Sequence, residues 1–204
     1  MLNFLGILSE GGSIFNLDKD ILLYIQDNIR CGVLDKFFPL ITHLGDAGLF
    51  WIILSAVLLL FKKTRKAGFI SALALIGSVL LNNLLLKPLV DRTRPYELIE
   101  ALKLIGKAAD DGSFPSGHTA ASIASAVAMF PNLKKRYGIP LFILALCISF
   151  SRLYIGIHYP SDVVGGFVIG LVLGILANIL GNLMIRKWQQ SHEKAEASQK
   201  ESDV

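Results

Sequence analysis

The sequence predicts an all-α polytopic membrane helix bundle, with five to six membrane helices and an N-terminal interfacial helix. Hydrophobic residues make up 53% of the 204 residues, and charged residues only 18%. The mean hydropathy is +0.56. The apolar runs are continuous rather than alternating, which favours helices over a β-barrel. This composition excludes a disordered chain, and no basic block is dense enough to indicate nucleic-acid binding.

The predicted spans are the segments that carry almost no charge. The stretch 67–86 has no charged residue, and a helix of this length covers about 30 Å, the thickness of the hydrocarbon core. The third span is short and rich in Ala and Ser, which suits a helix surrounded by other helices. The five predicted spans are 37–61, 67–86, 117–133, 139–155 and 162–185.

The chain divides into three parts. Residues 1–36 form an N-terminal interfacial segment, because the apolar stretch 21–29 is too short and too interrupted to span a membrane. A sixth membrane-embedded helix stays open there. Residues 37–185 form the membrane-embedded domain. Residues 186–204 are polar and are expected to form a disordered cytoplasmic tail.

The distribution of Lys and Arg predicts the orientation. The loop 62–66 holds four basic residues and no acidic one, and the loop 134–136 holds three. Basic loops face the cytoplasm in membrane proteins. The loops 87–116 and 152–162 are therefore expected to face outward.

Three polar clusters meet this outward face, at 87–95, 114–118 and 151–162. They contain three cations that suit a phosphate group, since an Arg fork matches phosphate oxygens: Lys87, Arg94 and Arg152. Ser116 and Gly117 stand at a predicted helix start, where unpaired backbone N–H groups favour an anion. The clusters together predict an anion-binding pocket.

Two histidines complete the predicted site. His158 and Asp162 are four residues apart, so one helical turn places the carboxylate against the imidazole. Such a carboxylate orients the ring and leaves Nε2 free to attack. His118 would then be free to protonate a leaving oxygen. The predicted catalytic residues are His158, His118 and Asp162, and no metal-ligand cluster is expected.

Three motifs carry a family resemblance: Lys-x6-Arg-Pro at 87–95, Pro-Ser-Gly-His at 115–118 and Ser-Arg-x5-His-x3-Asp at 151–162. Together they resemble the signature of the type 2 phosphatidic acid phosphatase family, which includes bacterial acid phosphatases and vanadium haloperoxidases. The similarity covers about residues 80–170. It implies that His158 forms a phosphohistidine, that His118 is the general acid and that Asp162 orients His158.

The same resemblance implies that five residues hold the phosphate oxygens: Lys87, Arg94, Ser116, Gly117 and Arg152. It also implies a metal-independent hydrolase without a cofactor.

The segment 41–48 resembles small bacterial members that act on undecaprenyl diphosphate, phosphatidylglycerophosphate or related lipids. We therefore expect an integral lipid phosphatase or diphosphatase in a bacterial cell membrane, with its site on the extracytoplasmic face. Undecaprenyl diphosphate is the favoured substrate. Phosphatidylglycerophosphate and broad-specificity lipid phosphatases are alternatives, and so is a non-catalytic lipid-phosphate binder or transporter. The expected partners are the lipid substrate and membrane lipids, and the oligomeric state stays open.

Four features outside the motifs also lead to expectations. Arg92 either reaches the membrane interface or contacts substrate. His43 and Asp46 belong to the outer end of the first span, or to the rim of the site. The apolar spacing in 96–113 is typical of an amphipathic helix, with an irregular loop as the alternative. Glycines at every fourth position, 166, 170 and 174, indicate close helix packing.

Overall fold

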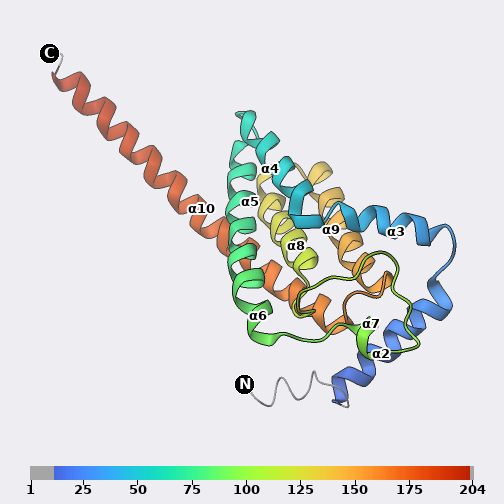
Figure 1. Ribbon diagram of the computed structural model, residues 1–204. Helices are drawn as coiled ribbons and strands as arrows, with labels where there is room; N and C mark the ends of the chain where they lie inside the picture. Colours follow the sequence, from blue (N-terminus) through green and yellow to red (C-terminus); the bar gives the residue numbers. More distant parts are fainter. Residues whose placement is uncertain (1–11, 203–204) are drawn as a thin grey trace.

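The computed structural model describes residues 12–202, and the first eleven residues of the predicted interfacial segment lie outside this range. The described residues contain helices, turns and loops and no strand (Figure 1). The α-helices are α2 Ser13–Tyr24, α3 Leu34–His43, α4 Leu49–Leu60, α5 Arg65–Ser78, α6 Lys87–Val90, α7 Pro95–Leu98, α8 Gly117–Met129, α9 Lys135–Tyr154 and α10 Pro160–Ser202. The π-helical segments are η1 Ile25–Ile29 and η3 Val79–Leu86, and the 3-10 segments are η2 Asp46–Gly48 and η4 Phe130–Asn132.

Among the described residues, three helical stretches are long and apolar enough to cross a membrane: Arg65–Leu98, Lys135–Tyr154 and Pro160–Glu196. They match three of the predicted spans. The first predicted span is a pair of helices, Leu34–His43 and Asp46–Leu60, bent by 45°. The all-helical membrane class is thus confirmed, whereas the number of spans stays a prediction.

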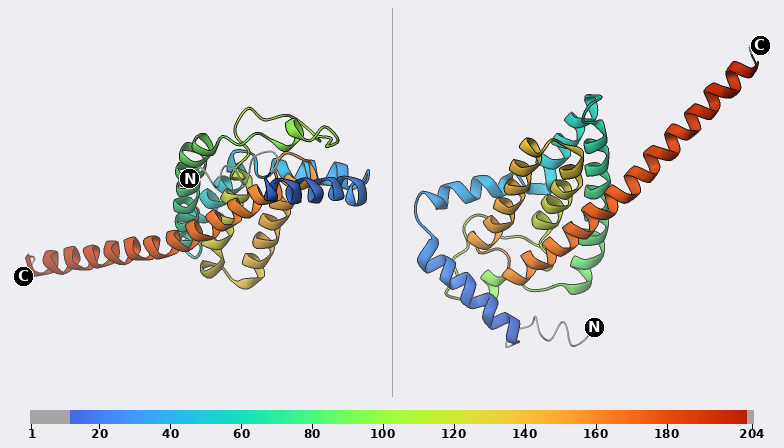
Figure 2. Two further views of the ribbon diagram at one scale, coloured as in Figure 1. Left: turned by 90° about the horizontal axis from the view of Figure 1, so that it is seen from below. Right: turned by 180° about the vertical axis from the view of Figure 1, so that it is seen from behind.

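The helix α8 fills the centre of the bundle, between α5, α9 and α10 (Figure 2). It has 13 residues, so it is shorter than a membrane-spanning helix of about 20 residues. The spaced glycines of α10 allow this packing. A Cβ at Gly166 would lie 2.6 Å from the Ser116 carbonyl oxygen, and one at Gly170 would lie 2.7 Å from that of Ala120. These two glycines therefore pack as predicted, against the backbone of α8.

The break between α3 and α4 places polar groups beside the start of α8. Ala47 and Gly48 have left-handed backbone angles, with φ of 49° and 68°, and this turn separates the two helices. A Cβ at Gly45 would lie 2.6 Å from Cδ2 of His118. The glycine thus leaves room for the imidazole of His118 next to the broken span.

The prediction of an amphipathic surface helix at 96–113 was wrong. Only α7, Pro95–Leu98, is helical there, and the loop alternative holds. Ile99 and Leu102 are 3% and 5% exposed and pack against Phe15 and Leu22 of α2. The side chain of Gln26 bonds to the backbone of this loop. Because tertiary contacts satisfy both the apolar side chains and the backbone, they override the helical spacing.

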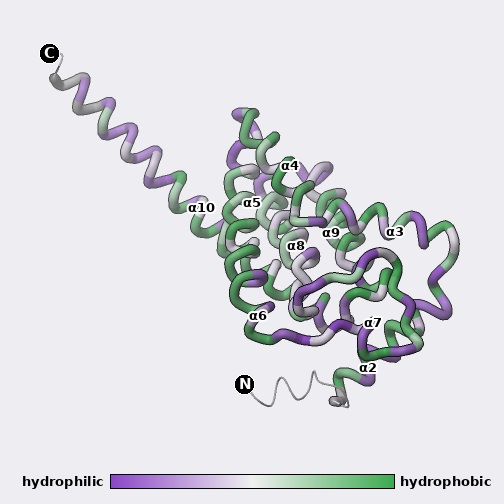
Figure 3. The backbone as a smooth tube through the Cα atoms, in the orientation of Figure 1, coloured by the Kyte–Doolittle hydropathy of each residue, from purple (hydrophilic) through white to green (hydrophobic). Residues whose placement is uncertain are grey.

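The end of α10 also differs from the expectation for 186–204. The helix runs without a break to Ser202 and projects beyond the bundle (Figures 1 and 3). The sequence 182–202 contains neither Gly nor Pro and is rich in Lys, Gln, Glu and Ala, which favour helices. Extending a helix that is already anchored adds one hydrogen bond per residue and needs no new nucleus. The structure thus gives residues 186–202 as helix where disorder was expected. Residues 203–204 lie outside the described range, and the cytoplasmic side of this segment stays a prediction.

Candidate active site

The predicted site residues converge at one end of the bundle, although three separate parts of the chain supply them. His158 lies in the short loop between α9 and α10 and is 1% exposed. Burial lowers the pKa of His158 well below its ordinary value of 6.5. Four neighbouring groups lower it further: Arg152, Arg94, Lys87 and His118. The imidazole is therefore neutral at pH 7, and it lies within electrostatic reach of all three predicted cations.

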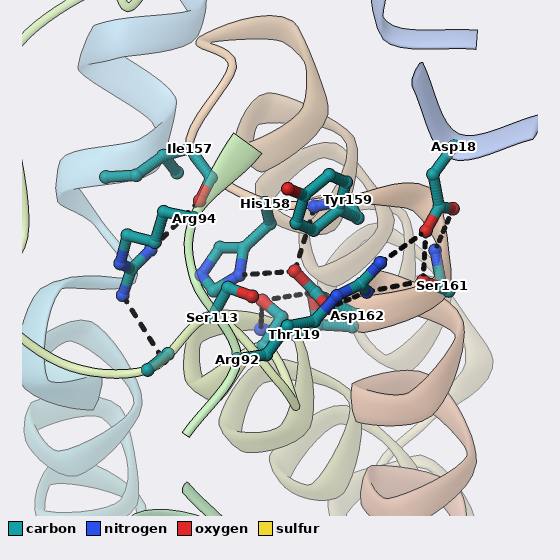
Figure 4. A network of polar contacts seen from close by, with 12 residues as sticks. Asp18, Arg92, Arg94, Ser113, Thr119, Ile157, His158, Tyr159, Ser161 and Asp162 are labelled. Carbon is teal, nitrogen blue, oxygen red and sulfur yellow. Dashed lines mark hydrogen bonds and ion pairs between the residues drawn. The ribbon is translucent and has the colours of Figure 1, made fainter. Parts of the chain in front are cut away.

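His158 and Asp162 form the pair that their spacing predicts. Nδ1 of His158 lies 3.3 Å from Oδ2 of Asp162, and both residues are buried. The same carboxylate oxygen accepts a hydrogen bond of 2.9 Å from the backbone N–H of Tyr159. In Figure 4 the ring of His158 lies between Arg94 and Asp162. The Nδ1 side of the imidazole is thus held by the carboxylate, and Nε2 is left for chemistry.

Lys87 and Arg94 share one carboxylate, that of Asp111 in the loop after α7. Nη2 of Arg94 lies 2.5 Å from Oδ1 of Asp111, and Nζ of Lys87 donates to Oδ2. Arg94 is further fixed by Nη1, which donates to the Ile157 carbonyl at 2.9 Å. The two cations therefore already hold a two-oxygen anion, as a phosphate requires.

Asp111 was missed in the sequence, where it is one of two adjacent acids in a polar loop. Partial burial by itself would raise the pKa of this carboxyl. The hydrogen bonds and charges of Lys87 and Arg94 outweigh burial and lower the pKa of Asp111 to about 2. Since its side chain is 55% exposed, Asp111 is an ionised group that reaches the two cations from the solvent side.

Arg152 lies in the last turn of α9 and is 6% exposed. Its Nη1 donates to the hydroxyl of Thr42 at 2.7 Å. Its buried Nε has no hydrogen-bond partner among the described residues. A buried guanidinium with an unused donor next to Lys87 and Arg94 supplies further binding capacity for an anion.

The start of α8 lies where the sequence predicts it. Ser116 is the N-cap, and its Oγ accepts hydrogen bonds from the Thr119 backbone N–H at 3.4 Å and the Thr119 hydroxyl at 3.0 Å. Gly117 is the first helical residue, and a Cβ there would lie 3.9 Å from Cε of Lys87. The structure therefore uses the Ser116 hydroxyl as a cap and places the positive end of the α8 dipole beside Lys87.

His118 belongs to a second pair of imidazole and carboxylate. Its Nε2 lies 2.9 Å from Oδ1 of Asp46. The other oxygen of Asp46 lies 2.7 Å from Nδ1 of His43. Of the two expected positions for Asp46 and His43, the structure therefore shows the one at the rim of the site. Nothing in the sequence spacing indicated the contact between Asp46 and His118.

Arg92 does not reach the membrane interface, since it is 8% exposed. Its Nη1 and Nη2 bond to protein groups, whereas its buried Nε has no hydrogen-bond partner among the described residues. Nη1 donates to Oδ1 of Asp162 at 2.6 Å, and Nη2 donates to Oδ2 of Asp18 at 2.9 Å (Figure 4). Arg92 thus connects the predicted site to α2.

Within residues 12–202, no group of three or more His, Cys, Asp or Glu side chains is arranged to hold a metal ion.

Fold and site together define a helical membrane protein with a cluster of cations and two pairs of histidine and aspartate. The chain belongs to the PAP2 superfamily, whose family model matches residues 67–184. The resemblance drawn from the three motifs is therefore confirmed.

The chain is similar to the undecaprenyl-diphosphatase of Sulfolobus acidocaldarius, with 32% identity over 120 residues, which cover 59% of this chain and 58% of that protein. It is similar to the undecaprenyl-diphosphatase BcrC of Bacillus subtilis, with 34% identity over 138 residues, which cover 67% of this chain and 69% of that protein. Among solved structures, a transmembrane PAP2-type phosphatidylglycerolphosphate phosphatase from Bacillus subtilis aligns with a TM-score of 0.70 and 26% identity. That alignment covers 89% of this chain and 94% of the other.

Proposed function

We propose that this protein is a membrane lipid phosphatase that cleaves a lipid phosphate or diphosphate through a phosphohistidine, with undecaprenyl diphosphate as the favoured substrate. One observation carries the proposal. The buried, neutral imidazole of His158 is held by Asp162 within electrostatic reach of Lys87, Arg94 and Arg152. A nucleophile oriented by a carboxylate and surrounded by fixed cations is suited to attack a phosphate group.

Substrate binding starts with the exchange of one anion for another. The phosphate replaces the Asp111 carboxylate between Lys87 and Arg94, and it takes the free Nε of Arg152. The positive end of α8 at Gly117 faces the same pocket from the side of Lys87. These groups stabilise the charge that spreads over the equatorial oxygens in the transition state.

The chemistry then proceeds in two steps. In the first, Nε2 of His158 forms a bond to phosphorus, the bond from phosphorus to the leaving oxygen breaks, and His118 donates a proton to that oxygen. Asp162 stabilises the positive charge on the His158 ring. In the second step, His118 takes a proton from water, which attacks phosphorus and releases phosphate from His158. Asp46 holds the His118 ring in place through both steps.

The relatives support the choice of substrate. Two similar proteins are named undecaprenyl-diphosphatases, and a similar structure is a phosphatidylglycerolphosphate phosphatase. We therefore keep phosphatidylglycerophosphate and a broad lipid specificity as alternatives.

The loop 62–66 lies at the end of the bundle away from the site (Figure 1). Its four basic residues favour a cell-membrane protein with an extracytoplasmic site and a cytoplasmic C-terminus.

Phosphate release by the purified protein in detergent tests the proposal. Undecaprenyl diphosphate, undecaprenyl phosphate and phosphatidylglycerophosphate are compared, each with the variant His158→Ala and the control His192→Ala, which changes an exposed residue far along α10. Release that depends on His158 supports a phosphatase, and the fastest substrate identifies the lipid. If the wild-type protein binds these lipids without releasing phosphate, it is a binder or transporter and the proposal fails.

A further inference from the structure

Asp18 of α2 lies against the start of α10, although the two are far apart in the sequence. Asp18 is 2% exposed. Its Oδ1 accepts a hydrogen bond of 2.9 Å from the backbone N–H of Ser161, and its Oδ2 accepts from the Ser161 hydroxyl. Ser161 is the second residue of α10. A carboxylate from another helix thus satisfies a free N–H at the helix terminus and interacts favourably with its dipole. It does so one residue before Asp162.

Arg92 joins Asp18 to Asp162. Its guanidinium donates to both carboxylates, at 2.9 and 2.6 Å, and also to the Ser161 hydroxyl at 2.7 Å. The guanidinium carbon lies 3.8 Å from the centre of the Tyr159 ring, which fixes its plane. Two buried carboxylates therefore share one buried cation. Removing a single partner from such a group leaves uncompensated charge, which is costly.

The position of Arg92 decides which carboxylate oxygen meets the histidine. Arg92 takes Oδ1 of Asp162, so that Oδ2 is left for Nδ1 of His158 and the N–H of Tyr159. The Tyr159 N–H and the Ser113 side chain also bond to this carboxylate. Without the Arg92 fork these bonds remain, but the carboxylate loses its charged partner, and its alignment with the imidazole is less tightly fixed. Lys in place of Arg keeps the charge but lacks the planar fork that bridges two acids.

We propose that Arg92 and Asp18 are positioning residues of the active site, which aim Asp162 at His158 and make α2 part of the catalytic unit. This inference rests on the proposed function, because it assigns both residues to the step that forms phosphohistidine. Groups that orient a direct ligand or catalytic side chain typically contribute about 10- to 100-fold. Arg92→Gln is expected to lower kcat by about this factor and to change KM by less than about threefold.

A double-mutant cycle separates positioning from mere support of the fold. If Arg92 acts through Asp162, then Arg92→Gln is expected to cost less than about threefold in a protein that already carries Asp162→Asn. Asp18→Asn is expected to lower kcat in the same direction as Arg92→Gln, and the two effects are expected to be less than multiplicative. The readouts are kcat, KM and the single-turnover rate of phosphoenzyme formation.

Two matched controls remove exposed residues of the same charge types. Asp20→Asn removes an exposed carboxylate two residues along α2, and Arg136→Gln removes an exposed guanidinium at the start of α9. Both are expected to retain wild-type kcat and KM. Size-exclusion profiles and melting curves of every variant show which of them are folded. If Arg92→Gln does not fold, Arg92→Lys takes its place, and a partial loss of kcat is expected for it.

The failures of the two proposals can be told apart. If the wild-type protein releases no phosphate, or if His158→Ala retains activity, the proposed function fails. If the wild type is active and His158→Ala is inactive, but a folded Arg92 variant has wild-type kcat, the positioning role is wrong. It is also wrong if the Arg92 substitution costs as much with Asp162→Asn as without it.

Discussion

The site contains two pairs of histidine and aspartate that differ in burial and in origin. His158 and Asp162 are almost fully buried, with side-chain exposures of 2% and 0%. They lie four residues apart, in the loop before α10 and in the first turn of that helix. His118 and Asp46 are 19% and 55% exposed and come from different helices. A nucleophile is more effective when it is held in one orientation and shielded from water. A group that donates a proton to the leaving oxygen and then accepts one from water must be accessible to water. The difference in burial thus matches the two proposed roles.

Removal of each imidazole in turn gives the strongest test of the two roles assigned to His158 and His118. His158→Ala is expected to abolish turnover of a lipid phosphate, by about 10⁴-fold or more, because no phosphohistidine can form. His118→Ala is expected to lower it by about 10²- to 10⁴-fold, the usual range for a general acid. Phosphate release from the purified variants measures both effects.

An activated substrate separates the two roles further. Nitrophenolate leaves without protonation, so para-nitrophenyl phosphate is expected to form phosphoenzyme rapidly with His118→Ala and not at all with His158→Ala. Equal behaviour of the two variants on this substrate would contradict the assignment of nucleophile and acid.

The loss of kcat is likewise expected to be larger for the aspartate that pairs with His158 than for the one that pairs with His118. Asp162→Asn is expected to lower kcat by about 10²- to 10⁴-fold, because it favours the wrong tautomer of a buried imidazole. Asp46→Asn is expected to cost only about 10-fold, since Asp46 orients a histidine that water can reach. Steady-state kinetics give kcat and KM for each variant. A larger loss for Asp46→Asn than for Asp162→Asn would reverse the comparison.

The carboxylate in the pocket gives a smaller effect of opposite sign. Asp111 pairs with Lys87 and Arg94, so in the proposed mechanism it competes with substrate for these two cations. Asp111→Asn is therefore expected to lower KM, and the inhibition constant of inorganic phosphate, by about two- to tenfold. Asp110→Asn is the neighbouring control. Weaker inhibition by phosphate in Asp111→Asn would mean that Asp111 holds the cations in place rather than competing for them.

Local patterns in the sequence predicted those parts of the site that one helix or one motif contains. The spacing of His158 and Asp162 predicted their contact, and the motif residues Ser116 and Gly117 predicted a helix start that the structure places there. Continuous apolar segments predicted the helical membrane class. Each of these features depends on neighbours within a few residues, which a sequence displays directly.

Contacts between distant segments were not predictable in this way. Asp18 reaches the site because α2 packs against the start of α10. Asp46 reaches it because the turn at Ala47 and Gly48 interrupts the helix between α3 and α4. The sequence left Arg92 between the membrane interface and a substrate contact, because nothing near it in the sequence shows its two acidic partners. The loop 96–113 has helical spacing, yet its apolar residues are buried by α2, so tertiary packing decided its structure.

The smallest expected effect concerns pH and follows from the burial of His158. Burial and the surrounding cations lower the pKa of this imidazole below 6.5, so protonation removes the nucleophile only at lower pH. With para-nitrophenyl phosphate, which needs no proton from His118, we expect the rate of phosphoenzyme formation to change by less than about threefold between pH 7.5 and 6.5, where an exposed histidine would become half protonated. In the unfolded chain the same imidazole binds its proton near pH 6.5. The unfolded state therefore gains protons first, and the melting temperature falls as the pH drops below this value. A loss of this rate that tracks a pKa of 6.5 or higher would contradict a buried, neutral His158.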